Sequence, residues 1–468
     1  MTAGARVVVV GAGPAGMRAA ERLVAAGRRP VVIDEAPRHG GQIYRQPPAA
    51  FRRERSDLYG FEADRASAVL DRFEALRSQV DHRPETLVWQ VEPNALQLLH
   101  AGRSETLGFD ALILATGATD RVLPFPGWTL PGIVTLGAAQ IALKYQATLI
   151  GPRVVFAGTG PLLYLVAWQY ASHGGEVAAV LDTAPFGAKL RALPKMAARP
   201  AVAAKGAYFL ARLRLAGVPV HSGVTLEEAE GATRVEALRW RANGTTYTTP
   251  CDAVGIGHGL RSETQLADLA GCAFAYDSLD QAWLPTRDGA GRSSVRGVYL
   301  AGDGAAILGA DAAELSGARA ALAALEDLGA APQPDVTARL DQDRGAHVRF
   351  REGMEIAFAL PRTWAADAPD GLIVCRCEEV TAGELRTCVR STGTREINRL
   401  KALTRIGMGR CQGRMCAPAA ARLLADAAGC TLEDVGRLRG QAPVKPLPIH
   451  LLRDAVDAQR VPAEEADD

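Results

Sequence analysis

The sequence predicts an α/β protein with two similar parallel-sheet halves and a small helical domain near its C-terminal end. A run of valines at residues 7–10 leads into a glycine-rich turn at 11–16 and then into a helical pattern. The same order returns at residues 153–172, and two close pairs of cysteines follow within residues 375–416. A strand, a glycine-rich turn and a helix in this order are typical of dinucleotide-binding, Rossmann-like folds.

The composition is that of an ordinary globular protein. The chain has 468 residues, 48% hydrophobic and 22% charged, which is enough for two or three domains with cores of their own. The net charge is +1 and no basic patch stands out, which argues against a nucleic-acid partner. No apolar run reaches the roughly 18–20 residues that span a bilayer, and the N-terminal stretch does not resemble a signal peptide. We therefore expect a cytoplasmic protein without a transmembrane segment.

The first glycine-rich turn has the features that bind a pyrophosphate. Gly11 permits a tight turn, Gly13 lets phosphates approach the backbone, and Gly16 brings the helix close to the sheet. Pro14 and Ala15 begin the helix, whose N-terminal NH groups attract an anion. We expect this turn to bind the pyrophosphate of a dinucleotide.

The chain after this helix adds further nucleotide contacts. A buried strand at residues 31–33 ends in Asp34 and Glu35, and the sequence does not tell which acid turns inward to hold a ribose hydroxyl pair. Gly41 and Gln42 follow at the point where many FAD-binding chains pass the ribityl chain and the flavin ring. The first half is therefore predicted to bind FAD.

Two later turns return to the same site. Residues 109–114 form a buried strand that leads into Ala115-Thr116-Gly117, the turn that closes the FAD domain in two-nucleotide flavoproteins. Residues 298–300 form a short strand that leads into Ala301-Gly302-Asp303, ahead of an alanine-rich helix. We expect Asp303 to hydrogen-bond the ribitol, and the helix N-terminus to face the polar pyrimidine edge of the flavin.

The second half repeats the first motif with one departure. Gly158 and Gly160 occupy the first two glycine positions, but Leu163 stands at the third, which places the helix farther from the strand. Asp182 ends the next strand and favours a ribose 2′-hydroxyl over a 2′-phosphate, so NADP is disfavoured. Three interpretations stay open: an NAD(H) site used in turnover, a non-reacting adenine nucleotide such as NAD or ATP, and an empty structural relic.

The C-terminal cysteines form a C-x-C pair, Cys375 and Cys377, and a C-x4-C pair, Cys411 and Cys416. Four thiolates on loops between short helices can hold a [2Fe–2S] cluster or a structural zinc ion. The spacing is less typical of zinc, and a flavin in the same chain gives a reason for an electron acceptor. We therefore expect a cluster, with zinc and plain cysteines as the alternatives.

These signals also divide the chain. A segment rich in proline and alanine at residues 330–334 marks the end of the nucleotide-binding part. The predicted parts are an FAD-binding domain (1–145 and 285–330), a second nucleotide-binding domain (146–284), a connector (331–370), a [2Fe–2S] cysteine domain (371–440) and a C-terminal tail (441–468).

Taken together, the motifs resemble one protein family over most of the chain. The matching runs are G-A-G-P-A-G, D-E-A-P-x-x-G-G-Q-I-Y-R, A-T-G-A-x-D-R-x-L-P-F-P-G-W, G-x-G-P-L-L, C-R-C-E-E-V-T and G-R-C-Q-G-R-M-C. They resemble the FAD-containing A (alpha) subunit of bacterial opine (octopine and nopaline) oxidases, hydrogen cyanide synthase and D-hydroxyproline or proline dehydrogenases. The implied fold is two domains of the pyridine-nucleotide-disulfide-reductase type, with a last domain similar to bacterioferritin-associated ferredoxin.

The resemblance implies an electron-transfer oxidoreductase subunit in a heteromeric complex. A partner of the D-amino-acid-oxidase type would carry its own FAD and oxidise the C–N bond of an amino acid or opine, and a small [2Fe–2S] subunit would complete the complex. This chain would pass electrons through its FAD and cluster to a respiratory-chain or quinone acceptor, at the periphery of the inner membrane. The resemblance implies that Cys375, Cys377, Cys411 and Cys416 are the cluster ligands, and it implies no catalytic acid, base or nucleophile. The FAD contacts that it implies are Gly11, Gly13, Gly16, Asp34 or Glu35, Gly41, Gln42, Thr116, Gly117 and Asp303.

Two other functions stay open. A free-standing NADH-dependent FAD/[2Fe–2S] reductase would bind NADH through Gly158, Gly160 and Asp182. An interaction or assembly protein would keep the nucleotide folds as structure and hold zinc in its last domain. The predicted FAD domain has no C-x4-C or C-x2-C pair, which argues against a disulfide reductase.

Overall fold

The computed structural model describes residues 4–48, 50–51 and 53–449, and its first half surrounds a five-stranded parallel sheet. The valines of the first strand are all buried, because both faces of this parallel sheet are covered. Val7 and Val9 pack with the helices, whereas Val8 and Val10 pack with a small antiparallel sheet. In spatial order the parallel strands are β20 (Val298–Leu300), β7 (Ala111–Leu114), β1 (Val7–Val10), β2 (Val31–Ile33) and β3 (Asp81–Arg83).

Helices α1 and α9 cover one face of this sheet and lie close together. Their approach depends on Gly317, where a Cβ atom would lie 1.9 Å from the carbonyl oxygen of Ala15. The helices of this half are α1 (Pro14–Ala25), α2 (Arg55–Tyr59), α3 (Ala63–Ala75) and α9 (Ala310–Asp327), with short 3₁₀ turns η1 (Gly60–Glu62), η2 (Arg77–Gln79) and η3 (Gly302–Gly304). The antiparallel sheet on the other face is β4 (Thr86–Glu92), β5 (Ala95–His100) and β6 (Arg103–Gly108).

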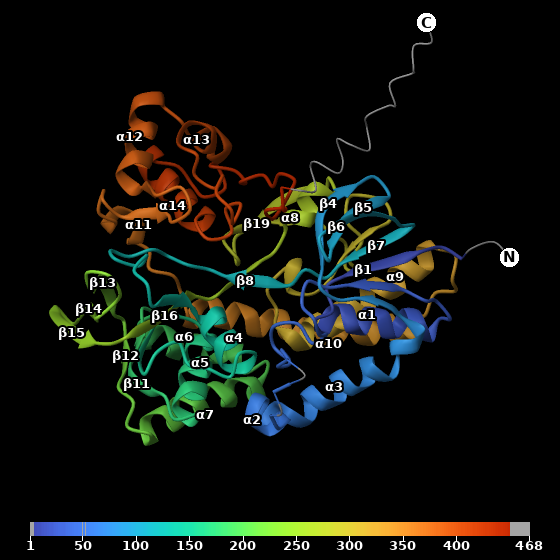
Figure 1. Cartoon of the computed structure of the whole chain (residues 1–468), viewed down its shortest axis with the longest axis horizontal. Helices are drawn as coiled ribbons and strands as arrows, with labels where there is room; N and C mark the ends of the chain where they lie inside the picture. Colours follow the sequence, from blue (N-terminus) through green and yellow to red (C-terminus); the bar gives the residue numbers. More distant parts are fainter. Residues whose placement is uncertain (1–3, 49, 52, 450–468) are drawn as a thin grey trace, which may run out of the picture.

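The second half repeats the parallel plan at the other end of the molecule (Figure 1). The spatial order of its strands is β12 (Val220–Ser222), β11 (Glu176–Asp182), β10 (Arg153–Thr159), β16 (Ala253–His258) and β9 (Ile133–Thr135). Its helices are α4 (Leu136–Lys144), α5 (Pro161–Ser172), α6 (Phe186–Met196) and α7 (Pro200–Leu215), and an antiparallel sheet is formed by β13 (Thr225–Glu230), β14 (Ala237–Ala242) and β15 (Thr245–Pro250). The predicted fold of two Rossmann-like halves is confirmed.

A two-stranded antiparallel ribbon joins the two halves. It consists of β8 (Ala118–Asp120) and β17 (Leu260–Ser262), which pair through Arg261 and Thr119 at their centre. The chain enters β8 directly after the Thr116-Gly117 turn and leaves β17 towards α8 (Gln265–Leu269), then β18 (Phe274–Asp277) and β19 (Ala282–Pro285). We call this element the connecting ribbon.

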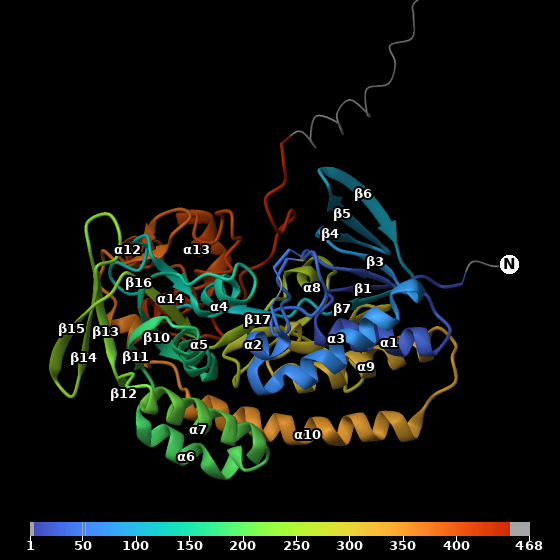
Figure 2. The same cartoon turned by 60° about the horizontal axis from the view of Figure 1, so that its bottom comes forward.

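The predicted connector is largely one long helix, α10 (Pro334–Ala357), which runs beneath both halves (Figure 2). Its Glu352 pairs with Lys195 of α6 at 2.5 Å. Its Arg351 pairs with Asp280 at 2.7 Å, between β18 and β19. Of the helices in the described residues, none is both long and apolar enough to cross a membrane.

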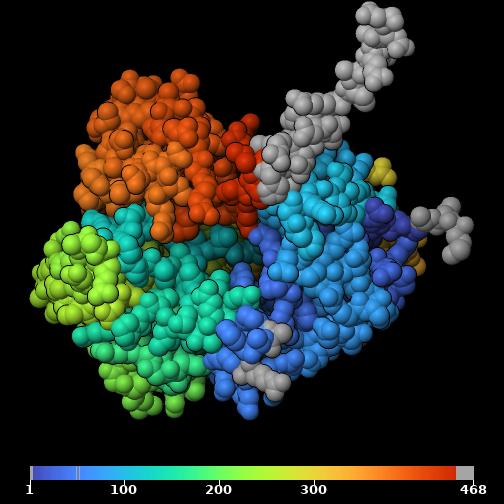
Figure 3. Space-filling view, viewed as in Figure 1, coloured from blue at the N-terminus to red at the C-terminus, as the bar shows by residue number. Residues whose placement is uncertain are grey.

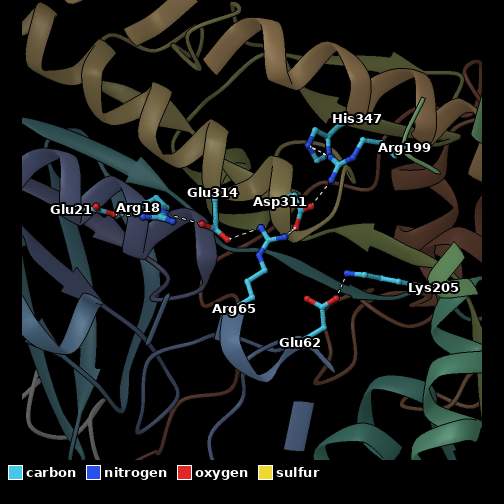
Figure 4. A network of polar contacts seen from close by, with 9 residues as sticks. All are labelled: Arg18, Glu21, Glu62, Arg65, Arg199, Lys205, Asp311, Glu314 and His347. Atoms are coloured by element: carbon cyan, nitrogen blue, oxygen red, sulfur yellow. Dashed lines mark hydrogen bonds and ion pairs between the residues drawn. The ribbon is translucent and has the colours of Figure 1, made fainter. Parts of the chain in front are cut away.

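A polar network ties α1, α3 and α9 to the second half (Figure 4). Glu314 of α9 accepts from Arg18 of α1 at 2.7 Å and from Arg65 of α3 at 3.1 Å. Asp311 of the same helix also pairs with Arg65, and with Arg199 at the start of α7 at 2.7 Å. Charged side chains from both halves thus form ion pairs with one another where the halves meet.

The last part of the chain is a small helical module that rests on the two halves (Figures 1 and 3). It contains β21 (Ile373–Cys375), β22 (Val380–Thr381), α12 (Ala382–Thr392), α13 (Ile397–Thr404) and α14 (Ala417–Ala428), preceded by α11 (Trp364–Asp367). We call residues 373–428 the cysteine module. Trp128 donates to the carbonyl of Ile373 at 2.6 Å, and Trp364 donates to that of Pro124 at 2.8 Å, so the module is docked. The predicted tail is described only as far as Ile449, and residues 450–468 lie outside the described residues.

Candidate functional site

The first glycine-rich turn lies between β1 and the N-terminus of α1. Gly11 has φ +106°, and a Cβ there would lie 2.2 Å from the carbonyl oxygen of Ala115 on the neighbouring strand. A Cβ at Gly16 would lie 1.7 Å from the carbonyl oxygen of Gly11. Gly13 is the N-cap residue of α1 and Pro14 is its first residue. Because Gly13 has no side chain, no side chain caps the NH groups of the first helical turn. This arrangement can receive an anionic phosphate group.

The structure separates the two acids that follow β2. Asp34 turns inward, and its carboxylate accepts from the backbone NH of Ala12 at 2.6 Å and of Ala36 at 2.7 Å. Burial raises the pKa of Asp34, and these two NH donors oppose that rise. Glu35 points away from the turn and pairs with Lys445 from the last described segment. Asp34 therefore holds the turn, whereas the carboxylate of Glu35 forms an ion pair with a side chain.

The other residues predicted to contact FAD gather at the same end of the sheet. Gly41 lies against Gly13, where a Cβ would come within 2.8 Å of the Gly13 Cα. Gln42 is exposed beside this contact. The hydroxyl of Thr116 donates to the carbonyl of Glu263 at 2.6 Å, and the carbonyl of Gly117 accepts from the Glu263 NH at 3.0 Å.

The Gly302-Asp303 turn closes the other side of this end of the sheet. A Cβ at Gly302 would lie 2.8 Å from the Cβ of Ala15, so the turn packs directly on α1. Asp303 accepts from the backbone NH of Leu308 at 2.9 Å and of Gly309 at 3.0 Å. Burial raises the pKa of its carboxyl, and the two NH donors oppose that rise. These residues fit an FAD. Glycines lie on both sides of the N-terminus of α1, at positions where a Cβ atom would collide with neighbouring atoms, so the backbone there stays accessible to a bound group.

The second half has a different environment at the equivalent acid. Asp182 is fully buried, and its carboxylate accepts from the Tyr164 hydroxyl at 2.6 Å, from Lys189 Nζ at 2.7 Å and from the Ala184 NH at 2.9 Å. Gly158 lies near the end of β10, Gly160 precedes α5 as its N-cap, and Leu163 is fully buried in that helix. The structure therefore brings the predicted residues together, but protein groups already occupy the acid predicted to hold a ribose.

The four predicted ligand cysteines come together on the two loops of the cysteine module and interact in two pairs. Cys375 pairs with Cys416, and Cys377 pairs with Cys411. The Cys416 thiol lowers the pKa of Cys375 to about 5, helped by nearby backbone NH groups and opposed by burial. In the described residues, no group of three or more histidine, cysteine or carboxylate side chains forms a site for a single metal ion. Two cysteine pairs are what a [2Fe–2S] cluster requires, since each iron takes two protein ligands.

The backbone around these sulfurs is shaped for close contact. The NH groups of Cys377, Glu378 and Gly407 are directed at the Cys375 sulfur. Gly409 runs so near to Cys377 that a Cβ would lie 2.2 Å from the Cys377 Cβ. NH groups that approach sulfur are one of the features by which a protein tunes a cluster. The donor set and its backbone therefore fit the cluster.

Comparison with known proteins agrees with this geometry. The pyridine nucleotide-disulphide oxidoreductase family matches residues 5–324, and the BFD-like [2Fe-2S] binding domain matches residues 373–426. The A (alpha) subunit of opine oxidase from Rhizobium meliloti is 39% identical over 94% of this chain and 86% of its own length. The chain belongs to the family of opine oxidase alpha subunits.

Relatives of this family extend the comparison. Hydrogen cyanide synthase subunit HcnB of Pseudomonas aeruginosa is 33% identical over 95% of this chain and 97% of its own length. The crystal structure of L-proline dehydrogenase from P. horikoshii shares the fold, with a TM-score of 0.72, 19% identity, and coverage of 96% of this chain and 79% of that one. The resemblance inferred from the motifs is confirmed. This member of the opine oxidase alpha-subunit family is an oxidoreductase subunit that binds FAD and a [2Fe–2S] cluster.

Sequence reasoning missed three residues at the borders of these sites. Arg261 of the connecting ribbon and Glu263 directly after it contact the cysteine loop, about 150 positions later in the chain. Lys144 of α4 is buried, and its Nζ donates at 3.1 Å to the carbonyl of Ile43, next to Gly41 and Gln42. No short motif surrounds any of them, so only the three-dimensional contacts identify them.

Proposed function

We propose that this chain is the electron-transfer subunit of an amino-acid or opine dehydrogenase, and that a partner subunit supplies its electrons. The partner is of the D-amino-acid-oxidase type with its own FAD, a small [2Fe–2S] subunit completes the complex, and the acceptor is a quinone or another respiratory-chain component. Support comes from relatives that are themselves named as subunits of an oxidase or a synthase. FAD supplies two-electron chemistry and the cluster supplies one-electron chemistry.

The occupied carboxylate of Asp182 is the observation that carries this proposal. An NADH-dependent reductase needs that acid to accept hydrogen bonds from ribose hydroxyls. Tyr164, Lys189 and the Ala184 NH already donate to it, and the side chain has no exposed surface. The second half then serves as a structural unit, and electrons enter from another protein.

In the first half, we propose that the glycine-rich turn binds the FAD pyrophosphate. Asp34, which turns inward and accepts from the NH groups of Ala12 and Ala36, and Glu35, which pairs with Lys445, are the two candidates for holding the ribose hydroxyls. Gly41, Gln42, Thr116, Gly117, Gly302 and Asp303 surround the ribityl chain and the flavin. Cys375, Cys377, Cys411 and Cys416 ligate the cluster.

An anaerobic titration of the purified holoprotein with NADH tests the proposal. We expect the visible flavin absorbance to stay oxidised with stoichiometric NADH, whereas dithionite reduces both flavin and cluster. Co-expression with its partner subunit should then allow an amino acid or opine substrate to reduce the flavin. Rapid bleaching of the flavin by NADH alone would support the free-standing reductase instead, and a colourless protein that contains zinc would support the assembly protein.

A further inference from the structure

The connecting ribbon contacts both cofactor sites at once. Its β8 strand begins directly after the Thr116-Gly117 turn of the FAD site. Its β17 strand ends at Ser262, directly before Glu263. Side chains of residues 261–265 reach the cysteine loop at residues 411–416. The ribbon is therefore the part of the chain where the two sites share a contact.

Glu263 contacts both the FAD-side turn and the cysteine loop. Its backbone holds the FAD-side turn, because its carbonyl accepts from the Thr116 hydroxyl at 2.6 Å and its NH donates to the Gly117 carbonyl at 3.0 Å. Its carboxylate accepts from Arg414 Nε at 2.7 Å, inside the Cys411–Cys416 loop. Both side chains of this ion pair are mostly buried, at 16% and 15% exposure, so solvent screens the pair less than a surface pair.

Arg261 and Gln265 add contacts on either side of Glu263. Arg261 Nη1 donates to the carbonyl of Arg414 at 3.1 Å and lies 3.4 Å from that of Gly413. Gln265 Nε2 donates to the carbonyl of Gln412 at 2.7 Å. A guanidinium is thus held against the backbone that carries Cys411 and Cys416.

Polar atoms without partners mark the same region. Thr119 Oγ1, Ser262 Oγ and Gln265 Oε1 are buried and have no hydrogen-bond partner in the described part of the chain. Buried polar atoms are normally satisfied by protein, water or a bound group. These three atoms, on the ribbon and at the start of α8, are therefore available to hydrogen-bond water or a bound group.

We propose that Glu263 and Arg261 are positioning residues that form the electron-transfer junction between the FAD and the [2Fe–2S] cluster. The Glu263–Arg414 pair fixes the cysteine loop to the FAD-side turn, and the Arg261 guanidinium favours the reduced, more negative cluster. With both groups bound, one electron would pass from the reduced flavin to the oxidised cluster and from there to the quinone or respiratory-chain acceptor of the proposed function. A second electron would then follow by the same route, and the two flavin protons would pass to solvent. This inference rests on the proposed function, in which the flavin reduces the cluster.

The test uses the full-length holoprotein and two variants, Glu263→Gln and Arg261→Gln. Flavin is photoreduced anaerobically, the rate of cluster reduction is followed by absorbance, and the midpoint potentials are determined by titration with EPR detection of the cluster. We expect Glu263→Gln to slow the exchange by about tenfold without lowering the cluster potential. We expect Arg261→Gln to shift the one-electron equilibrium towards the flavin by about tenfold, which is about 59 mV for one electron.

Arg405→Gln is the matched control, because it also removes one arginine charge from the cysteine module. Arg405 pairs with Glu378 at 2.8 Å, is 66% exposed and does not contact the ribbon. We expect its exchange rate and cluster potential to stay within about twofold of the unmodified protein, as exposed ion pairs are weak. If Glu263→Gln loses a cofactor, Arg414→Lys keeps the charge and removes the Nε contact, and it should slow the exchange in the same way.

The possible results distinguish a failure of the proposed function from a failure of the junction formed by Glu263 and Arg261. If the unmodified protein never transfers an electron from photoreduced flavin to its cluster, the proposed function is wrong. If it does so, but the ribbon variants match it in both rate and potential, the junction is wrong. Equal shifts in Arg405→Gln and Arg261→Gln would also overturn the junction, because they would trace the effect to net charge alone.

Discussion

The two halves share a strand, a glycine-rich turn and a helix, and each places an acid after its second strand. In the first half Asp34 bonds only to the backbone of Ala12 and Ala36, so it stabilises the turn that would hold a phosphate. In the second half Asp182 accepts hydrogen bonds from the side chains of Tyr164 and Lys189. The partners of the acid, more than the motif around it, decide whether a nucleotide can be recognised.

The two halves also differ at the third glycine position of the motif, which is Gly16 in the first half and Leu163 in the second. Gly16 allows α1 to approach the Gly11 carbonyl more closely than any side chain would permit. Leu163 instead fills its place with a fully buried side chain that packs in the core of the second half. The third position thus allows a close helix–strand approach in the first half and contributes a core side chain in the second.

Gly16→Ala should produce the largest effect that distinguishes the halves. The new Cβ would lie 1.7 Å from the Gly11 carbonyl oxygen, so α1 must move and the phosphate-binding turn must change shape. Overpacking of this kind costs about 1–3 kcal/mol, and each 1.4 kcal/mol lost from FAD binding is about tenfold in affinity. We expect purified protein to lose most of its flavin, measured as the ratio of flavin to protein absorbance.

Leu163→Ala is the matching change in the second half. It should destabilise the fold by about 2–5 kcal/mol through a cavity, while the flavin content of the folded protein stays normal. Equal flavin loss in both variants would contradict the view that only the first half binds the cofactor.

Features that depend on local chemistry could be predicted from the sequence. The Thr-x-x-Glu pattern at Thr381 and Glu384 forms a capping box, and the alanine-rich helix Ala417–Ala428 ends where Gly429 follows it. The alternation of the β1 valines between the two faces of the sheet likewise follows from the strand geometry. Such features depend on neighbours only a few residues away.

Features that depend on long-range contacts could not be predicted. The sequence left Asp34 and Glu35 as equal alternatives, because their different directions depend on how the turn folds back on Ala12. The Glu263–Arg414 pair joins residues 151 positions apart. No local pattern marks such a pair, and it forms only because the cysteine module docks on the connecting ribbon.

Lys144→Met tests the contact between the halves and should have an intermediate effect. Lys144 belongs to α4 of the second half, and its ammonium reaches the Ile43 carbonyl of the first half and the ring of Tyr59. Burial lowers the pKa of Lys144 from 10.5 to about 8. A shift of this size corresponds to at most about 3 kcal/mol, so Met at this position should stabilise the protein near pH 7 by roughly that amount or less.

The gain from Lys144→Met should depend on pH in a defined direction. Between about pH 8 and 10.5 the unfolded chain keeps the lysine proton that the folded protein has lost, so the stability of the unmodified protein rises with pH across this window. The advantage of the variant should therefore be full below pH 8 and shrink towards pH 10. Denaturant unfolding at pH 7 and pH 9.5 measures it, and a constant difference would contradict the burial of a charged lysine at this contact.

Tyr164→Phe should have the smallest effect, and it addresses the occupied carboxylate directly. The change removes one of the three groups that donate to Asp182, and Lys189 and the Ala184 NH remain. A hydrogen bond to a charged group contributes about 1.5 kcal/mol at the lower end, so we expect a loss of stability of about that size in denaturant unfolding. The freed lone pair of Asp182 also becomes available to a ribose hydroxyl, so calorimetry should detect tighter NADH binding, by up to about tenfold. If the affinity for NADH is the same before and after the change, the Tyr164 hydroxyl is not what closes the second half, and the difference between the halves must lie in the Leu163 helix instead.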